Sequence, residues 1–488
     1  MKTALLTILF MLFSTTLDAA IIKIYTQQDF DRLSANIVSA INRGEKDIVV
    51  DIEARELTFS DNQITLSNIN RNDVSISIHG KGVQIICQGH SVKKLSHPSF
   101  MYLKNKKYYN PWTEFKLPLD TISIIDKPSH LCAITTLQKN KKDKHPQNKH
   151  IHYTCWFTSR TSPIKSISKR QITFDGGDWA VPRKENSHNV NMDYTYAKRY
   201  PRYRLFGTKK IKGKIYECSA STILRLANCS IQSFTLDGIH VTGSNCDGPL
   251  LFINQCKANT ITISGSTFHS IGGSILIDRK STNVCFTGNK VDTFIGFGIQ
   301  SERGSSGSKV TNNTFTNCTL GMKQGFAIQM LSKNFTVSGN TISDFCYGGI
   351  GVGIWGGTKT EDKCSGIVNN NEIFYTSQFL NDIEQNTLMD SGAIYAWTNC
   401  DGITISQNYI HDISGIKDNR GIFCDDGTKN VTLSENKIER IHNSYDIDLR
   451  WSEIYKENVP DHNTRNRMLN NSTTGKVRFE TQKANPKK

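Results

Sequence analysis

Short runs of alternating apolar and polar residues recur through the second half of the 488-residue chain. Side chains of a β-strand point alternately to its two faces, so this two-residue period predicts strands rather than helices. The position of an Asn, or of the residue in its place, recurs in steps of 23 to 37 residues, which is a solenoid repeat length. The copies span residues 235–241, 263–268, 286–291, 310–315, 337–342, 368–373, 405–410 and 433–438.

The repeat length and the period together select one kind of solenoid. A propeller blade of about 40 residues needs four strands, and helical repeats need a period of about 3.6 residues. A leucine-rich repeat needs a leucine consensus, which these copies lack. A parallel β-helix remains, with one coil per repeat and strands about 4.8 Å apart. We expect the recurrent Asn to stack as a hydrogen-bonded ladder at a tight bend, where Asn tolerates the left-handed conformation.

Residues 21–89 are expected to hold the cap and the first coils. Five apolar residues share one face of an amphipathic helix between residues 30 and 42: Phe30, Leu33, Ile37, Val38 and Ile41. Such a helix would close the open end of the β-helix, as the ends of solenoids require. Apolar alternation then predicts strands at residues 48–52, 57–59, 64–66 and 74–78.

The segment of residues 90–215 interrupts the repeats. It lacks the Asn pattern but has strand-like runs at residues 121–125, 152–157 and 171–174, which predict an inserted β-rich subdomain. Residues 90–214 hold 26 Lys and Arg against 8 Asp and Glu, a charge of +18, while the whole chain is +15. The β-helix is therefore close to neutral, and the insert has either an anionic partner or a solvated basic face.

The N-terminus predicts export. Residues 1–20 have a basic start, a short apolar run and small residues ending at Ala20, which is the pattern of a secretory signal. No later apolar run is long enough to cross a bilayer. We expect a secreted or periplasmic monomer, and export argues against nucleic acid as a partner. The β-helix should occupy residues 216–451 and a polar tail residues 452–488.

The 13 cysteines do not form a disulfide framework in this interpretation. Several lie inside apolar repeat segments, where thiols pack as small hydrophobic groups, so most are expected to be free and buried. No cysteine or histidine pair has the spacing of a structural zinc site, and we expect no bound metal.

A second strand follows each bend and carries the candidate binding site. Its copies are residues 275–278, 299–302, 328–331, 394–397, 422–425 and 447–450. If the first and third residues face the core, the second and fourth face outward. The second positions are Gln300, Gln329, Tyr395, Phe423 and Asp448, and the fourth are Asp278, Glu302, Leu331, Trp397, Asp425 and Arg450. Aromatic rings, amides and charges on one face suit a carbohydrate, with Tyr395, Trp397, Asp448, Arg450, Glu302 and Gln300 as substrate-binding candidates.

Two motifs on adjacent coils supply candidate catalytic carboxylates. One contains Asp390, and the other contains Asp425 and Asp426. Glycoside hydrolysis needs one carboxyl group as the acid and one as the nucleophile or base. Arg450, one coil further on, would favour the anionic form of Asp425, which suits a nucleophile or base. Desolvation beside the aromatic residues would make Asp390 the acid.

The spacing leaves the identity of the pair open. Along straight strands Asp390 and Asp425 would lie about 23 Å apart, so they need a bend at residues 391–392 to meet. Asp425 and Asp448 need no bend, because their Cα atoms would lie about 8 Å apart on neighbouring coils. Asp390 and residues 425–427 also suit a purely structural role, as a strand cap and a turn.

Residues 390–395, 408–413 and 421–427 together resemble right-handed parallel β-helix proteins of the pectate-lyase-like superfamily. More narrowly, they are similar to β-helical glycoside hydrolases of the fucosidase and xylanase type, over about residues 216–451. The resemblance implies an all-β, right-handed fold and catalytic Asp residues in these segments. Phe423 and Cys424 stand where Tyr and Leu are commoner, a change that leaves the carboxylates in place.

Three functions are compatible with these residues. The first is an exported glycoside hydrolase that needs no cofactor and acts on a complex polysaccharide, anionic ones included, through Asp390, Asp425 and Asp426. The second is a polysaccharide lyase, often helped by Ca²⁺, with Arg279, Lys280, Arg303 or Lys323 as the base. The third is a solenoid that binds glycans without cleaving them. No carboxylate cluster beside a Lys or Arg stands out, which favours the hydrolase.

Overall fold

The computed structural model describes most of the β-helix and the strands of the insert. The described residues are 19–92, 215–245, 248–319, 325–353, 363–376, 391–397, 400–414, 419–425, 428, 430–442, 444–450 and 466–480, together with eight strands between residues 102 and 206. Residues 1–18 of the predicted signal lie outside this part of the chain. Among the described residues, no helix is long and apolar enough to cross a membrane.

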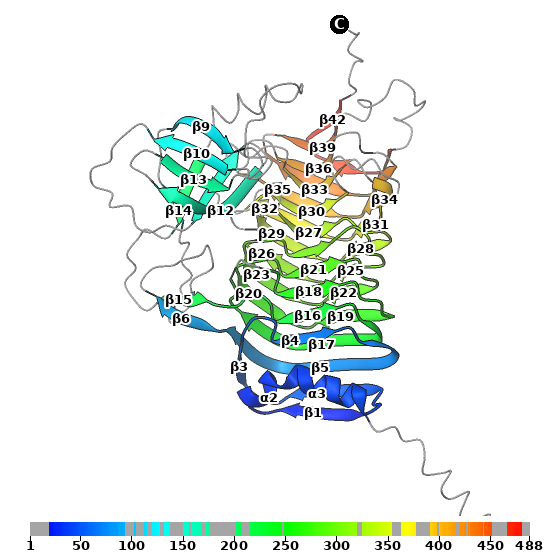
Figure 1. The fold of residues 1–488 in the computed structure, drawn as a ribbon. Helices are drawn as coiled ribbons and strands as arrows, with labels where there is room; N and C mark the ends of the chain where they lie inside the picture. The colour runs from blue at the N-terminus through cyan, green and yellow to red at the C-terminus, as the bar shows by residue number, and fades with distance from the viewer. Residues whose placement is uncertain are drawn as a thin grey trace, which may run out of the picture.

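Each coil contributes strands to three faces of a parallel β-helix, and the coils stack from the blue end to the red end in Figure 1. One face is an eleven-stranded sheet. Its strands are β4 (Ile64–Ser67), β16 (Leu224–Ala227), β18 (Leu251–Asn254), β21 (Leu276–Arg279), β24 (Ile299–Ser301), β27 (Phe326–Met330), β30 (Gly348–Val352), β33 (Gly392–Ala396), β36 (Arg420–Cys424), β39 (Tyr445–Arg450) and β42 (Lys476–Glu480).

The other two faces share a 21-stranded sheet that folds around the Asn bend. Before the bend lie β1 (Ala20–Ile24), β2 (Asp47–Ile52), β19 (Thr260–Ser264), β22 (Val284–Thr287), β25 (Lys309–Thr311), β28 (Phe335–Ser338), β31 (Cys364–Asn369), β34 (Cys400–Ser406), β37 (Val431–Ser434) and β40 (Arg467–Leu469). After it lie β3 (Glu56–Phe59), β20 (Thr267–Ile271), β23 (Lys290–Phe294), β26 (Thr314–Thr316), β29 (Thr341–Phe345), β32 (Glu372–Thr376), β35 (Tyr409–Ile413), β38 (Lys437–Ile441) and β41 (Ser472–Thr473). The long strands β5 (Asn70–Cys87) and β17 (Ser230–Thr242) run through both faces.

Residues 467–480 differ from the sequence-based expectation of a polar tail. They form β40, β41 and β42, which pair in parallel with β37, β38 and β39 and so add one more coil. The alternation in this coil is short and mostly polar, which is why the apolar pattern alone did not reveal it.

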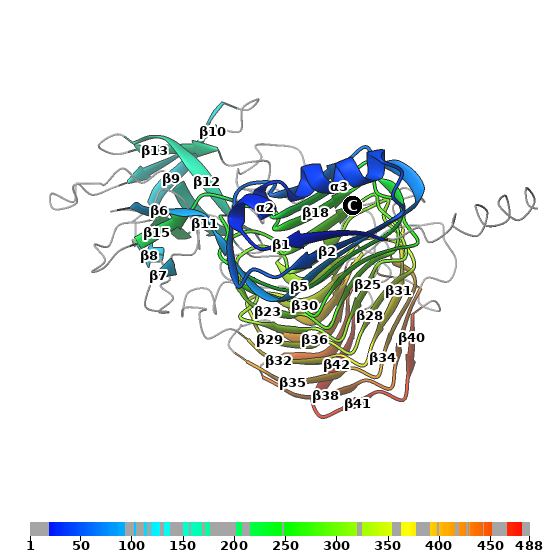
Figure 2. The same cartoon turned by 90° about the horizontal axis from the view of Figure 1, so that it is seen from below.

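The predicted cap is present as two short helices, α2 (Gln27–Asp31) and α3 (Leu33–Asn42), which lie across the end of the first coil (Figure 2). Thr26 and Asp29 form a reciprocal capping box that starts α2. Phe30, Leu33, Ile37 and Ile41 are buried as expected, but Val38 is 38% exposed and does not belong to the packed face.

The strands of the insert form separate antiparallel sheets. Seven strands pair in the order β8-β14-β11-β12-β13-β10-β9, and three pair in the order β6-β15-β7. Their bounds are β6 (Gly89–Val92), β7 (Tyr102–Leu103), β8 (Trp112–Glu114), β9 (Leu119–Asp126), β10 (Leu131–Thr136), β11 (His150–Cys155), β12 (Thr158–Ile167), β13 (Gln171–Asp175), β14 (Arg202–Phe206) and β15 (Ile215–Cys218). The seven-stranded sheet stands beside the coils in Figure 1.

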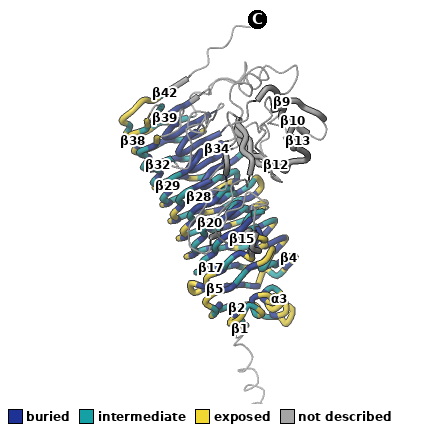
Figure 3. Tube along the Cα trace, turned by 90° about the vertical axis from the view of Figure 1, so that its left-hand side faces the viewer, coloured by how far each residue is buried: buried dark blue, intermediate teal, exposed yellow. Residues whose placement is uncertain are grey.

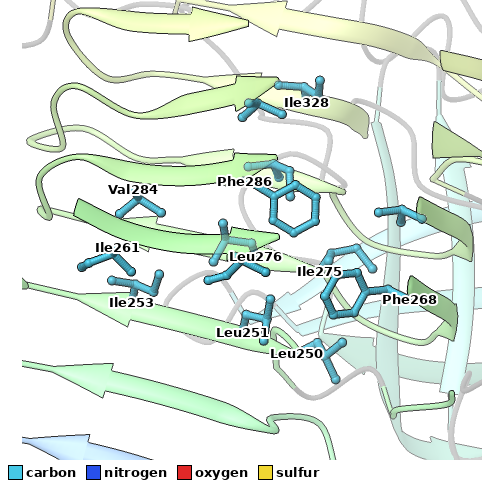
Figure 4. Close-up of a cluster of buried hydrophobic side chains, with 14 of the residues drawn as sticks. Leu250, Leu251, Ile253, Ile261, Phe268, Ile275, Leu276, Val284, Phe286 and Ile328 are labelled. Carbon is cyan, nitrogen blue, oxygen red and sulfur yellow. The ribbon is translucent and has the colours of Figure 1, made fainter. Parts of the chain in front are cut away.

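Apolar side chains fill the inside of the coils, and buried residues alternate with more exposed ones along the strands (Figure 3). Phe268, Phe286 and Phe315 stack on three successive coils, with ring centroids 5.8 and 6.3 Å apart. Figure 4 shows Phe268 and Phe286 among the Leu and Ile side chains of the facing strands. Removing this apolar area from water is the main term that stabilises the coils, at about 25 cal/mol per Å².

The predicted amide ladder is confirmed. The backbone N–H of each ladder residue donates to the side-chain oxygen of the next coil's ladder residue at 2.9–3.1 Å, through Ser266, Asn289, Asn313, Asn340, Asn371, Asn408, Asn436 and Asn471. The expected left-handed conformation, however, belongs to the residue before each of these. Gly265, Gly288, Asn312, Gly339, Asn370, Gln407, Glu435 and Asn470 have φ of 53–67°. The preceding residue makes the bend, so the ladder Asn can turn its amide inward.

Candidate functional site

One outward-facing column of residues runs up the eleven-stranded sheet. In register it contains Gln300, Gln329, Gly351, Tyr395, Phe423, Asp448 and Arg478. The predicted neighbours Tyr395, Phe423 and Asp448 are therefore on successive coils, as the alternation indicated. The sequence reasoning missed the coil of β30, because Gly351 presents no side chain at the outward position.

Asp278 does not belong to the outward face, contrary to the expectation. Leu276 pairs with Ile299, so Asp278 pairs with Ser301 and points into the coil, where it is 1% exposed. Three serine hydroxyls donate to its carboxylate, from Ser301 at 2.9 Å, Ser305 at 3.1 Å and Ser308 at 2.8 Å. Burial raises the pKa of Asp278 although these hydrogen bonds oppose the rise. Three successive apolar residues precede Asp278, so alternation alone could not set its register.

A cluster of aromatic side chains covers the upper part of the outward column. The Tyr395 ring stacks on Trp397 and on Phe423, with centroids 4.3 and 4.7 Å apart. Phe326 contacts Trp397 edge-on at 5.2 Å, and Tyr347 completes the cluster. All five residues are buried, so the rings form an apolar wall beside the carboxylates rather than a freely exposed platform.

Glycines of β30 make room for this cluster. A Cβ atom added at Gly348 would lie 2.2 Å from the Phe326 ring, and one added at Gly351 would lie 2.9 Å from it. Phe326 and Tyr347 were not predicted as site residues. The only sequence signal for them is the pair of outward glycines on the coil between Gln329 and Tyr395.

Asp425 lies directly against the aromatic cluster, at the end of β36. The Tyr395 hydroxyl on the preceding coil donates a 2.6 Å hydrogen bond to Asp425 Oδ2. The Asp425 backbone N–H donates to Ala396 O at 2.9 Å, and Thr428 Oγ1 donates to Asp425 O at 2.5 Å. Asp425 is 6% exposed; Tyr395 orients its carboxyl group, and the bonds with Ala396 and Thr428 hold its backbone.

Asp448 is held in a buried ion cluster with Arg420 and Arg478. Its Oδ2 accepts hydrogen bonds of 2.5 Å from Arg420 Nε and 2.5 Å from Arg478 Nη2, and its Oδ1 accepts one of 2.8 Å from Arg478 Nε. Asp448 and Arg420 are both 0% exposed, and the Arg420 guanidinium lies 3.9 Å from the centroid of Phe423. Both carboxylate oxygens of Asp448 bind guanidinium groups, so Asp448 fixes the position of Arg420 against the Phe423 ring.

Cys424 directly precedes Asp425 and pairs with Leu449, the residue after Asp448. Its thiol faces the core, and burial raises its pKa first, with the nearby charges of Asp448 and Asp425 adding to the effect. Both carboxylates are thus close to one thiol. The predicted two-residue offset between Asp425 and Asp448 is also confirmed, because Asp448 pairs with Phe423.

Gln300 and Glu302 lie on lower coils of the same sheet. Gln300 Nε2 donates to Gln329 at 2.9 Å, and Arg279 binds Glu302 through two hydrogen bonds of 2.6 and 3.0 Å. The Glu302 carboxylate raises the pKa of the Arg279 guanidinium further. These side chains are more exposed than the aromatic cluster and offer polar groups along the same face.

Three of the predicted site residues cannot be placed in full. Asp390 and Asp426 lie outside the described residues. The backbone of Arg450 is in β39 and pairs with Glu480, but its side chain is outside the described part. Among the described residues, no three His, Cys, Asp or Glu side chains come together as they would around a metal ion.

Comparisons with known proteins identify the fold. A family model described as a right-handed beta helix region matches residues 214–360, and no curated protein matches the chain. A solved structure named glycoside hydrolase has a TM-score of 0.55 at 10% identity, over 93% of this chain and 95% of its own. A polygalacturonase from Erwinia carotovora ssp. carotovora has a TM-score of 0.37 at 10% identity, over 89% of this chain and 96% of its own.

The solved structures found also include a bacteriophage protein. The gp54 tailspike of Acinetobacter baumannii bacteriophage AP22, solved with a capsular saccharide, has a TM-score of 0.24 at 8% identity, over 88% of this chain and 76% of its own. At these identities the comparisons show the fold alone, and the expected right-handed parallel β-helix is confirmed.

Proposed function

We propose that this chain, a right-handed parallel β-helix protein of the pectate-lyase-like superfamily, is a secreted glycoside hydrolase that cleaves a complex polysaccharide with Asp425 as its nucleophile or base. The observation that carries the proposal is the 2.6 Å hydrogen bond from Tyr395 to the Asp425 carboxylate, beside a wall of aromatic rings. Asp390 or Asp426 supplies the second carboxyl group, the general acid.

The surroundings of Asp425 suit that role. A hydrogen bond to one carboxylate oxygen fixes the rotation of the group, which a nucleophile or a positioned base requires. The apolar wall of Tyr395, Trp397 and Phe423 keeps water away and strengthens electrostatic interactions with a developing oxocarbenium ion. The name of the solved glycoside hydrolase with the similar fold supports the same reaction class.

The lyase alternative has less support from the described residues. A lyase needs a Lys or Arg that gives up its proton easily, but Arg279 is bound by Glu302 and its pKa is raised. Arg420 and Arg478 are bound to Asp448. Arg279, Arg420 and Arg478 therefore serve as ion-pair partners rather than as bases.

The test is a glycan-panel digest with wild-type protein and the Asp425→Asn variant. Loss of one catalytic carboxylate should lower turnover by about 10²–10⁴-fold while glycan binding persists. Asp237→Asn is the matched control, because Asp237 is a half-exposed carboxylate on β17, paired with His79 on another face. Full activity of Asp425→Asn would refute the proposal.

Product analysis separates the remaining functions. New reducing ends without ultraviolet absorbance indicate hydrolysis, and unsaturated, absorbing products indicate a lyase. Binding without any released sugar by the wild-type protein would identify a non-catalytic glycan-binding solenoid.

A further inference from the structure

Cys87 and Cys218 meet where the chain leaves the β-helix for the insert and where it returns. β5 ends at Cys87, and the antiparallel strands β6 and β15 lead out and back, with Gly89 paired with Cys218. Figure 1 shows this ribbon running outward from the lower coils. Since Cys87 and Gly89 are two residues apart, Cys87 and Cys218 lie on the same face of the ribbon, as diagonal neighbours.

Both cysteines lie directly above Gly243. A Cβ atom added to Gly243 would lie 3.0 Å from Cys218 Sγ and 3.4 Å from Cys87 Cβ, so both cysteines border the same small space. The thiols are hydrogen-bond partners, and this contact lowers the pKa of Cys87 although burial opposes it. Both residues are 7% exposed. Gly243 has a φ of +81°, and a side chain there would displace the Cys218 sulfur atom.

Other neighbouring cysteines have a different geometry. Cys364 and Cys400 are register partners on the parallel strands β31 and β34. Cys229 and Cys256 immediately precede a similar parallel bridge between Ser230 and Lys257. The thiols of these two pairs are hydrogen-bond partners as well, but their strands run in the same direction and neither pair encloses the insert.

We propose that Cys87 and Cys218 form a disulfide in an oxidising environment, which closes residues 88–217 into a covalent loop anchored on the β-helix. In the structure both are thiols, as are all ten described cysteines. With glutathione disulfide as oxidant, the Cys87 thiolate displaces one glutathione thiolate, and the Cys218 thiolate then displaces the second from the mixed disulfide. Two thiols and one glutathione disulfide thus give one protein disulfide and two reduced glutathione molecules.

Closing this loop ties the two ends of the insert together. β6, β15 and β7 form a sheet separate from those of the coils, and a long loop without a cross-link has high conformational entropy when it opens. A bridge at Cys87 and Cys218 keeps the insert attached at its base even after a cut within it.

The test uses the full chain, secreted under oxidising conditions or treated with glutathione disulfide, with free thiols then blocked by N-ethylmaleimide in denaturant. Mass spectrometry of the digest should show the Cys87 and Cys218 peptides linked, and reduction should separate them. Cys285→Ser, which removes a partly exposed thiol, should leave the linked peptide unchanged. Cys87→Ser should leave Cys218 blocked by the reagent. Wild-type protein in which both cysteines carry the reagent after oxidation would overturn the proposal.

A second readout does not depend on a variant that must fold. Limited proteolysis of the oxidised wild-type protein within residues 88–217 should give one band on a non-reducing gel and two bands after reduction. Two bands under both conditions would also overturn the proposal.

Discussion

The hydroxyl of Tyr395 lies 2.6 Å from Oδ2 of Asp425, although the two residues are 30 positions apart in the chain. They meet because the coil register places Tyr395 beside Phe423, two residues before Asp425. A phenol that donates to a carboxylate both orients the group and stabilises its charge. Tyr395 therefore belongs to the aromatic cluster and also positions the carboxylate proposed as the nucleophile or base.

Tyr395→Phe should lower activity while the ring packing is kept. The variant loses one hydrogen bond to a charged group, worth about 1.5–3 kcal/mol, so kcat should fall by about 10- to 100-fold with little change in KM. Steady-state release of sugar measures both constants. Tyr409→Phe is the control, since Tyr409 donates a hydrogen bond of the same length to Glu439 on another face. Equal losses in the two variants would argue against a role at the site.

Asp448→Asn should destabilise the fold strongly. The variant removes the negative charge that Asp448 places beside the buried guanidinium of Arg420 and beside that of Arg478, and breaking a buried ion pair costs about 3–5 kcal/mol. Urea unfolding at neutral pH measures the loss. Glu302→Gln, which breaks the more exposed pair with Arg279, should cost less than about 1 kcal/mol. A small loss in Asp448→Asn would show that the buried cluster contributes little.

Asp278 should make the protein less stable as the pH rises. Burial raises its folded-state pKa above the ordinary 3.8, so folding takes up a proton. The stabilising contribution is complete below pH 3.8 and is lost as the pH rises through the folded-state pKa. Asp278→Asn, a neutral analogue, should have a flatter dependence of unfolding free energy on pH above this point. An unchanged slope would contradict the expectation.

Asp73 provides a comparison of opposite sign. Its hydrogen bond with Arg71 lowers its pKa to about 2, so its contribution is present above pH 3.8 and is lost as the pH falls toward 2. Asp73→Asn should therefore weaken the protein at neutral pH relative to acid, whereas Asp278→Asn acts in the other direction.

Asn340→Ala should open the amide ladder in its middle. Its Oδ1 accepts from the backbone and side chain of Asn313, and its Nδ2 donates to Asn371 Oδ1 and Val310 O, all at 2.9–3.0 Å. Unsatisfied buried groups cost about 1–3 kcal/mol each, so chemical denaturation should show a loss of about 2–4 kcal/mol.

Two further variants test whether the loss of stability in Asn340→Ala comes from the ladder. Asn340→Ser should lose less than Asn340→Ala, because Ser266 already serves as a ladder residue and accepts from the Ile239 N–H at 3.2 Å. Asn259→Ala, at an exposed position outside the ladder, should be close to wild type. Similar losses at positions 340 and 259 would show that the ladder does not stabilise the coils.

Much of the fold was predictable because its signals are local. Alternation places Tyr395 and Phe423 outward, and the spacing of Asn313 and Asn340 sets the coil length. The same reasoning failed where the local pattern is ambiguous or weak. The apolar run before Asp278 made its register ambiguous. Because Gly351 has no side chain, the alternation did not predict its coil of the eleven-stranded sheet.

The sequence by itself determined that this chain is a β-helix and which residues share its outward column, because a period of two and a recurring bend need only neighbouring residues. Only the tertiary structure decided what those residues do to one another. Asp448 binds guanidinium groups from the coils on both sides, and Tyr395 reaches Asp425 across a coil boundary. Such pairs depend on side-chain direction and burial between distant segments, which no local pattern encodes.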